Sequence, residues 1–153
     1  MSTGVKKDYQ HNNINETFSY GVIYVYSVPL PYWKGRLKIG STTINIPNPT
    51  QQDIETAAKN NRIKNQTQTA DVPFKLEYAL LSVTDNGDYF SDKDVHSVLI
   101  RSGFPRKAKS TDNSKSEWFE IDLEIAKKAI KAVKEGQKSL TTEERTAPQI
   151  SQF

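Results

Sequence analysis

The chain of 153 residues contains no cysteine, which excludes disulfide bonds, thiol nucleophiles and thiolate metal sites. Histidine is scarce as well: His11 and His96 stand far apart in the sequence, so a zinc site that needs both is not expected. No apolar run approaches the roughly 20 residues that cross a membrane, and the first residues lack the apolar core of a signal peptide. We therefore expect a cytoplasmic protein in a reducing environment, with no membrane partner.

The composition indicates one folded domain. Hydrophobic residues make up only 35% of the sequence, but aromatic residues, at 10%, are too frequent for a fully disordered chain. A length of 153 residues fits a single domain that buries its own core. The net charge of +3 permits a polyanionic partner such as nucleic acid, although charge alone does not indicate one.

The succession of β-branched and amphipathic segments predicts an α/β fold, in which a small antiparallel sheet of about three strands is flanked by helices. The first strand is apolar on both faces, as a central strand must be, and forms a hairpin with the second. The expected elements are strands at 20–27 and 36–40, a loop at 41–50, a helix from 51 or 52 to 66, a strand at 72–83, a helix from 91 to 102, a short extended segment at 117–121 and a helix capped by Asp122. Three regions follow from this order: an N-terminal extension at 1–19, the folded domain at 20–136 and a polar tail or interdomain linker at 137–153.

Side-chain periodicity predicts which residues share a face. The spacing of Ile54, Ala58 and Arg62 places an arginine on the apolar stripe of the first helix. Ser91 and Asp94 have the spacing of a helix cap and its first-turn acid. Alternation in the third strand puts four apolar residues on one face: Phe74, Leu76, Tyr78 and Leu80.

A series of short motifs runs through these elements. In chain order they are Val22-Ile23-Tyr24, Lys38-Ile39-Gly40, Arg62 on the first helix, Asp92 four residues before His96 on the second helix, and Glu117-Trp118-Phe119. This order resembles the GIY-YIG endonuclease superfamily over residues 20–121, in the branch common in phages and restriction-type proteins, which also writes Lys-Ile-Gly. The sequence departs from the family pattern at Val22, which replaces a glycine, and at Asp92, which is one methylene shorter than the usual glutamate.

The resemblance implies a divalent-metal-dependent endonuclease that hydrolyses DNA phosphodiester bonds. Tyr24 would be the general base, which requires a neighbouring cation because tyrosine ordinarily loses its proton at about pH 10. Lys38 on the adjacent strand is the candidate for that cation. Arg62 would stabilise the phosphate through its guanidinium fork, Asp92 would hold one Mg²⁺ or Mn²⁺, and His96 would contact phosphate.

Each of these residues also has a structural interpretation that the sequence leaves open. Tyr24 can be a core residue with its hydroxyl bonded, and Lys38 can be a solvated strand residue. Arg62 can form a surface ion pair. Asp92 lies in a first helical turn, where acids favour the helix dipole regardless of function. His96 can be a structural hydrogen-bonding residue.

Further basic and aromatic residues suggest a path for DNA, although scattered charges of this kind are often solvated surface. The candidate nucleic-acid-binding residues are Arg36, Lys64, Arg106, Lys107, Lys109 and, at the hairpin tip beside Tyr32, Trp33. The expected partners are DNA and, from the resemblance, a fused or associated helicase or restriction module. The alternative function is a nucleic-acid-binding domain that has the same fold and does not cleave.

Overall fold

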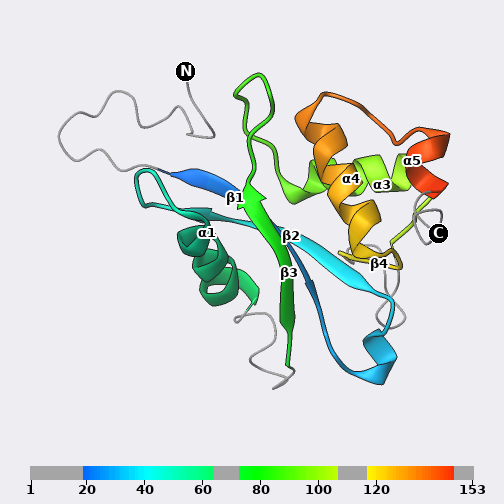
Figure 1. Cartoon of the computed structure of the whole chain (residues 1–153), viewed down its shortest axis with the longest axis horizontal. Coiled ribbons are helices and arrows are strands. Elements are labelled where there is room, and N and C mark those ends of the chain that lie inside the picture. Colours follow the sequence, from blue (N-terminus) through cyan, green and yellow to red (C-terminus); the bar gives the residue numbers. More distant parts are fainter. Residues whose placement is uncertain (1–18, 64–72, 107–116, 147–153) are drawn as a thin grey trace, which may run out of the picture.

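The fold is a four-stranded antiparallel sheet, in the order β3-β1-β2-β4, with helices on both faces (Figure 1). The computed structural model describes residues 19–63, 73–106 and 117–146. The elements are β1 (Tyr20–Ser27), the 3₁₀ helix η2 (Pro31–Trp33), β2 (Leu37–Ile44), α1 (Gln51–Ala57), the π-helical segment η3 (Ala58–Ile63), β3 (Lys75–Leu81), α3 (Asp92–Arg101), β4 (Trp118–Phe119), α4 (Leu123–Lys134) and α5 (Thr142–Thr146). This architecture confirms the predicted α/β class, and the short extended segment supplies the fourth strand.

Strand β1 is the centre of the sheet and is buried on both faces. Ile23 and Val25 belong to the core that α3 and α4 cover, whereas Tyr24 and Tyr26 belong to a second core on the face covered by α1. A strand with two buried faces has no polar alternation, which explains its continuous apolar sequence. Tyr24 and helix α3 therefore lie on opposite faces of the sheet, as the positions of α1 and α3 in Figure 1 make visible.

Strand β2 is longer than predicted, and part of its outer edge, called the open edge below, has no strand partner within 19–63, 73–106 and 117–146. The expected loop at 41–50 is wrong for its first residues, because the β-branched residues up to Ile44 continue the ladder with β1. On its other side β2 pairs with β4 at Leu37 and Lys38. From Gly40 onward this edge has no strand partner among the described residues. The open edge therefore begins within the Lys-Ile-Gly tripeptide.

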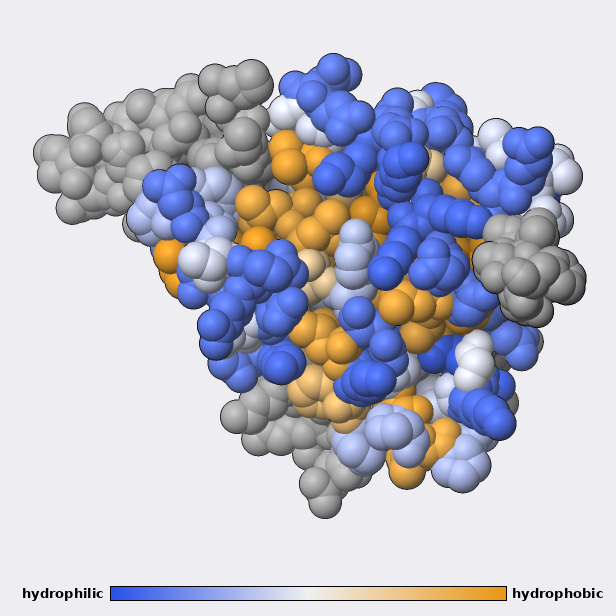
Figure 2. All heavy atoms as spheres, in the orientation of Figure 1, coloured by the Kyte–Doolittle hydropathy of each residue, from blue (hydrophilic) through white to orange (hydrophobic). Residues whose placement is uncertain are grey.

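Strand β3 does not have the single apolar face that alternation predicted. Its register with β1 shifts at Glu77, which is the extra residue of a β-bulge. One extra residue reverses the alternation, so Phe74 and Leu76 pack on the Tyr24 side of the sheet, and Tyr78 and Leu80 pack on the α4 side. On the face shown in Figure 2, hydrophobic residues gather in a band between α1 and α4, where β3 forms the sheet edge.

The helices begin at the capping residues that the sequence indicates. The Ser91 Oγ accepts a hydrogen bond from the Lys93 amide, and the Asp94 carboxylate accepts one from the Ser91 amide at 2.9 Å, which closes a capping box on α3. The Asp122 carboxylate accepts a hydrogen bond from the Ile125 amide at 2.9 Å and caps α4. Both predicted helix starts are confirmed.

The beginning of the expected polar tail packs on the domain. Leu140 is buried in the α3–α4 core, and its amide donates a hydrogen bond to the Ser102 Oγ at 2.8 Å. The Arg145 guanidinium on α5 donates a hydrogen bond to the Ser102 carbonyl at 2.9 Å. The buried Leu140 side chain and the hydrogen bonds to Ser102, at the C-terminal end of α3, thus hold the segment from Leu140 to Arg145 against the domain. Among the described helices, none is long and apolar enough to cross a membrane.

Candidate functional site

Tyr24 lies directly opposite Gly40 in the β1–β2 ladder, and its side chain is fully buried. A Cβ atom placed on Gly40 would lie 2.6 Å from the Tyr24 Oη and 2.7 Å from its Cζ, closer than real Cβ contacts allow. The missing side chain at Gly40 therefore makes the space through which the phenol crosses β2. The Tyr24 Oη therefore lies above Gly40, where it is buried. Glycine is therefore required at position 40 of the Lys-Ile-Gly tripeptide, because any side chain there would collide with Tyr24.

Lys38 shares the Tyr24 face, as the hairpin predicted, and is opposite Tyr26 in the ladder. Its Nζ lies 5.9 Å from the centroid of the Tyr26 ring and 3.6 Å from the Glu117 Oε1. The two charged side chains are only 14% and 27% exposed, so water screens their attraction incompletely. The Glu117 carbonyl also accepts a hydrogen bond from the Ile39 amide at 3.3 Å. Glu117 therefore holds Lys38 on the Tyr24 face, two residues along β2 from Gly40, the residue opposite Tyr24.

Arg62 lies in η3, which packs on the Tyr24 face. Ala58, the first residue of this segment, is in the same core as Tyr24. The predicted α-helix is wrong at 58–63, because the backbone changes there to a π-helix with a wider turn. The last part of this prediction, 64–66, lies outside the described residues. The stripe that aligned Arg62 with Ile54 assumed an α-helical period throughout, and that assumption fails. The Arg62 side chain lies outside the described residues.

Asp92 is the first residue of α3 and lies on the other face of the sheet. Its Oδ1 accepts a hydrogen bond from the Ser41 hydroxyl at 2.8 Å. Ser41 is opposite Ile23 in the ladder, which places it on the α3 face. The carboxylate is partly exposed, and its Oδ2 makes no hydrogen bond within the described part of the chain. Ser41 thus positions Asp92 and leaves one oxygen available.

The candidate groups come from both faces of the sheet and meet at one stretch of β2. Tyr24 lies over Gly40 on one face, and Asp92 is bonded to the next residue, Ser41, on the other. The roles suggested by the family resemblance would require Tyr24, Lys38, Arg62 and Asp92 to converge in one cleft. The structure instead groups Tyr24, Lys38 and the backbone of the Arg62 segment on one side, with Asp92 on the opposite side. The two groups meet β2 at adjacent residues, where Asp92 is partly exposed and the Tyr24 Oη is buried.

The donor set around Asp92 suits a hard divalent cation better than a soft one. The oxygens present are those of the Asp92 carboxylate and the Ser41 hydroxyl, and Mg²⁺ and Mn²⁺ prefer oxygen ligands. Within 19–63, 73–106 and 117–146, no group of three or more His, Cys, Asp or Glu residues forms a metal cage. A cation here would accordingly be held by one carboxylate, with water and substrate oxygens as its other ligands.

His96 is a core residue of α3 and is 2% exposed. Its Nε2 lies 2.8 Å from the Ile39 carbonyl oxygen, to which it donates a hydrogen bond, and its ring lies 5.1 Å from that of Phe119. This geometry favours the structural interpretation of His96 over direct contact with phosphate. Together with the Asp92–Ser41 bond, one turn earlier on α3, it fixes the helix to the middle of β2.

The burial of His96 predicts a loss of stability in mild acid. Desolvation lowers the pKa of His96, and this outweighs the Ile39 carbonyl and the Asp92 charge, which both raise it. Below about pH 6.5 the unfolded chain binds a proton that the folded chain refuses, so the free energy of unfolding falls by up to about 1.4 kcal/mol per pH unit. Urea unfolding between pH 7.5 and about pH 5.5 should show this decline. His96→Gln, which retains a donor, should flatten the decline, and an unchanged slope in this variant would assign it to another group.

Tyr89 is a neighbour of Asp92 that sequence patterns do not reveal. Burial first, and then the charges of Asp92 and Asp94, raise the pKa of Tyr89. Its ring lies against the backbone of Gly21, where any Cβ would collide with it. Ser41, Glu117 and Tyr89 are therefore the site residues that the sequence analysis did not assign. The signals for the first two were their positions, directly after Lys-Ile-Gly and at the start of the Glu-Trp-Phe segment.

The candidate nucleic-acid-binding residues are dispersed. The Arg36 guanidinium lies 4.8 Å from the centroid of the Tyr32 ring, and Arg106 forms an isolated β-bridge with Phe119. Trp33 is half-buried, with its ring 4.6 Å from that of Trp118. The remaining candidates lie outside the described residues: Lys64, Lys107 and Lys109.

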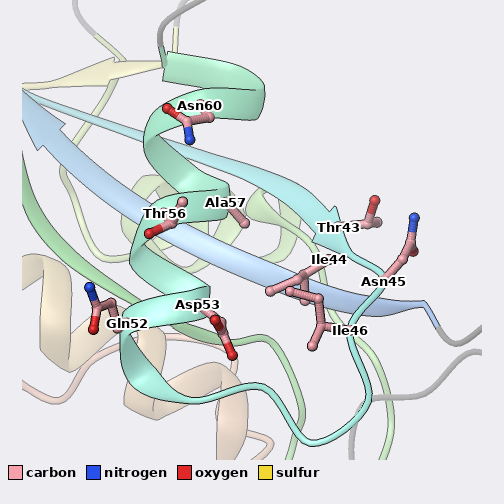
Figure 3. A pocket seen from close by; sticks show the side chains of 9 residues that line it. All are labelled: Thr43, Ile44, Asn45, Ile46, Gln52, Asp53, Thr56, Ala57 and Asn60. Atoms are coloured by element: carbon pink, nitrogen blue, oxygen red, sulfur yellow. The ribbon is translucent and has the colours of Figure 1, made fainter.

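A hollow of about 390 Å³ lies on the α1 face beyond the candidate groups (Figure 3). It separates the end of β2 from α1 and η3, and Figure 3 shows Asp53 and Ala57 on the helix side across from Ile44 and Ile46. Asp53 is already engaged in the capping box of α1. The other polar side chains of this hollow are uncharged amides and hydroxyls, so it extends the polar surface without adding a catalytic group.

Comparison with known proteins identifies a family for most of this fold. A family model described as the T5orf172 domain matches residues 21–134, which include both tripeptides, all four strands and helices α1, α3 and α4. No curated protein and no solved structure gives a match.

Proposed function

The chain belongs to the T5orf172 domain family, a phage-associated family related to nuclease folds, and from this premise we propose that it is a divalent-metal-dependent endonuclease of the GIY-YIG type that hydrolyses DNA. The observation that carries the proposal is the arrangement at β2, where Tyr24 lies over Gly40 and Asp92 is bonded to Ser41. The Tyr24 phenol and the Asp92 carboxylate thus lie on opposite faces of β2, against the consecutive residues Gly40 and Ser41. The proposal requires the buried Tyr24 hydroxyl to become accessible to water when a phosphodiester binds at the open edge.

Tyr24 is the proposed general base. Hydrolysis forms a phosphorus–oxygen bond from water and breaks the one to the sugar oxygen, so a base must remove a proton from the attacking water. Lys38 lies on the same face and supplies a nearby positive charge that favours a phenolate. Glu117 holds Lys38 in position. Arg62, whose segment packs on this face, is the proposed partner of the phosphate oxygens as charge develops on them.

Asp92 is the proposed ligand of Mg²⁺ or Mn²⁺. The cation, when bound, would neutralise charge on the phosphate and on the leaving oxygen. Ser41 orients the carboxylate through its hydroxyl, and His96 secures helix α3 against β2. His96 is accordingly a positioning residue in this proposal, since its ring is buried in the core.

Arg36, Arg106, Lys64, Lys107, Lys109 and Trp33 are proposed to contact the DNA backbone or bases around this edge. Phosphate contacts of this kind position the duplex without reading its sequence. A fused or associated helicase or restriction module remains the proposed protein partner, and the reducing cell interior the proposed location.

A second function has a specific observation in its favour. The side chain of Tyr24 is fully buried, and burial opposes formation of a phenolate. A domain of the same fold that binds nucleic acid without cleaving it would keep such a tyrosine as a core residue.

Plasmid nicking separates these two functions. The endonuclease should nick supercoiled DNA in Mg²⁺ or Mn²⁺ and stop when EDTA is added. Binding of the same DNA in EDTA, without nicking under any metal, would support the non-cleaving domain instead. The absence of both would contradict each proposal.

A further inference from the structure

The connection between β1 and β2 carries the most exposed large hydrophobic side chain of the described residues. Tyr32 is 57% exposed, and its neighbour Leu30 is 40% exposed. The connection extends from the end of the sheet, away from the helices (Figure 1). An aromatic ring at a protruding tip is a surface that a partner can reach, with an apolar body and a polar hydroxyl.

This tip is built rigidly. The amides of Trp33, Lys34 and Arg36 donate hydrogen bonds to carbonyls within the same connection, at 2.9, 3.2 and 3.1 Å. Gly35 takes a positive φ of 78° that permits the tight return to β2. A rigid tip loses little conformational entropy when it binds a partner.

An aromatic stack connects the tip to the candidate site. The ring of Trp33 lies 5.0 Å from that of Tyr32, nearly perpendicular to it, and 4.6 Å from that of Trp118. Trp118 in turn lies 5.7 Å from Tyr26, which stacks on Tyr24 at 6.1 Å. Trp33 packs against the Tyr24 core, so the stack lies on the Tyr24 face. Trp33 is thus the support, and Tyr32 is the ring that a partner can reach.

The charges within the connection are positive, whereas Glu77 and Asp122 line the hollow beside Lys34 and Arg36. Residues 28–36 contain Lys34 and Arg36 and no aspartate or glutamate. The Arg36 guanidinium lies over the Tyr32 ring at 4.8 Å, where a cation interacts favourably with the aromatic face. An exposed ring with the Arg36 cation over it, and with Lys34 two positions along the chain, matches the chemistry of an unpaired nucleotide, which offers a flat base to stack and a phosphate to neutralise.

We propose that Tyr32 is a stacking platform for an unpaired base of single-stranded DNA, with Lys34 and Arg36 contacting the adjacent phosphates. The platform rests on the proposed DNA-directed function and adds a substrate class to it. Val28, where the connection begins, lies roughly 13 Å along the strand from Tyr24, given about 3.3 Å per residue. In this proposal a single DNA strand anchored at Tyr32 runs along β2 to the open edge. The preferred substrate therefore contains an unpaired segment beside the cleaved bond.

The two tryptophans of the sequence, Trp33 and Trp118, both lie in this stack, so intrinsic fluorescence reports on the platform. We expect saturable quenching when short oligodeoxythymidylate is added to the full chain in EDTA. Tyr32→Ala should weaken the affinity about 5- to 100-fold, the range for loss of one stacked base. Tyr32→Phe should bind like the wild type, because the ring is retained.

Two controls define the contact. Ile100→Ala removes a comparably exposed apolar side chain, 42% exposed, from α3, and should leave the affinity unchanged. An abasic oligonucleotide has the same phosphates without bases, so wild type and Tyr32→Ala should bind it equally and weakly. Thermal unfolding of Tyr32→Ala should match that of the wild type, because the side chain is exposed.

The platform is contradicted if Tyr32→Ala binds oligodeoxythymidylate as tightly as the wild type, or loses affinity equally for the abasic strand. Plasmid nicking without any binding of single strands would overturn the platform and leave the endonuclease proposal intact. Stacking that depends on Tyr32, in a chain that never nicks plasmid, would support the platform and overturn the endonuclease.

Discussion

Asp92→Asn is expected to slow metal-dependent DNA cleavage about 1,000-fold or more. The substitution keeps the size of the side chain and an oxygen that accepts from Ser41, but it removes the charge that holds the cation. Stabilisation of a phosphoryl transition state by a metal ion is worth several kcal/mol, which corresponds to this loss in rate. DNA affinity in EDTA should change little, because the removed charge repels phosphate. Single-turnover cleavage and equilibrium binding measure the two effects separately.

Asp94→Asn is the matched control for this variant. Asp94 lies in the same first turn of α3, and its carboxylate is engaged in the capping box with Ser91. Its loss should cost about 1 kcal/mol of stability and leave the cleavage rate intact. Asp92→Glu restores the length that the family resemblance leads us to expect and should raise the rate. Full activity in Asp92→Asn would exclude Asp92 as the ligand and direct attention to Glu117.

Local rules of sequence account for much of the framework. The apolar run from Tyr20 to Ser27 indicated a strand buried on both faces, and β1 is the central strand. Ser91 and Asp122 indicated two helix starts, because capping depends on residues only three positions apart. The hairpin placed Lys38 and Tyr24 on the same face through period-2 alternation.

The errors occur where the backbone departs from a regular period. A bulge at Glu77 divides the apolar residues of β3 between two faces, and no residue type in that strand announces it. The change to a π-helix at Ala58 removes the basis for the Arg62 alignment. Both features depend on how a segment fits its neighbours, which a single sequence does not encode locally.

The candidate site shows the same division. The sequence indicates the candidate residues Tyr24, Lys38 and Asp92, but the residues that contact Lys38 and Asp92 come from distant segments. The hydrogen bond from Ser41 to Asp92 spans 51 positions, and the ion pair of Lys38 with Glu117 joins the second motif of the series to the last. Such partners become visible only when the register of the sheet and the docking of α3 are known.

Tyr24→Phe is expected to lower the cleavage rate about 100- to 10,000-fold, the usual contribution of a general base. The change removes one hydroxyl and keeps the ring that fills the space above Gly40. DNA affinity should be unaffected, since the hydroxyl is proposed to act on water rather than on the DNA backbone. Single-turnover rates at saturating DNA across neutral to alkaline pH should show that the wild-type rate rises with pH and that the variant has lost this rise.

Tyr26→Phe provides the control within the same stack. Tyr26 is 1% exposed and lies 6.1 Å from Tyr24, so it is buried to a similar degree in the same core, and phenylalanine retains the ring below Lys38. Both variants lose one buried hydroxyl and should show similar small losses of stability, about 1 kcal/mol. Only Tyr24→Phe should lose cleavage. Equal rates in the two variants would show that Tyr24 is a core tyrosine, because a base cannot be removed without consequence for the reaction.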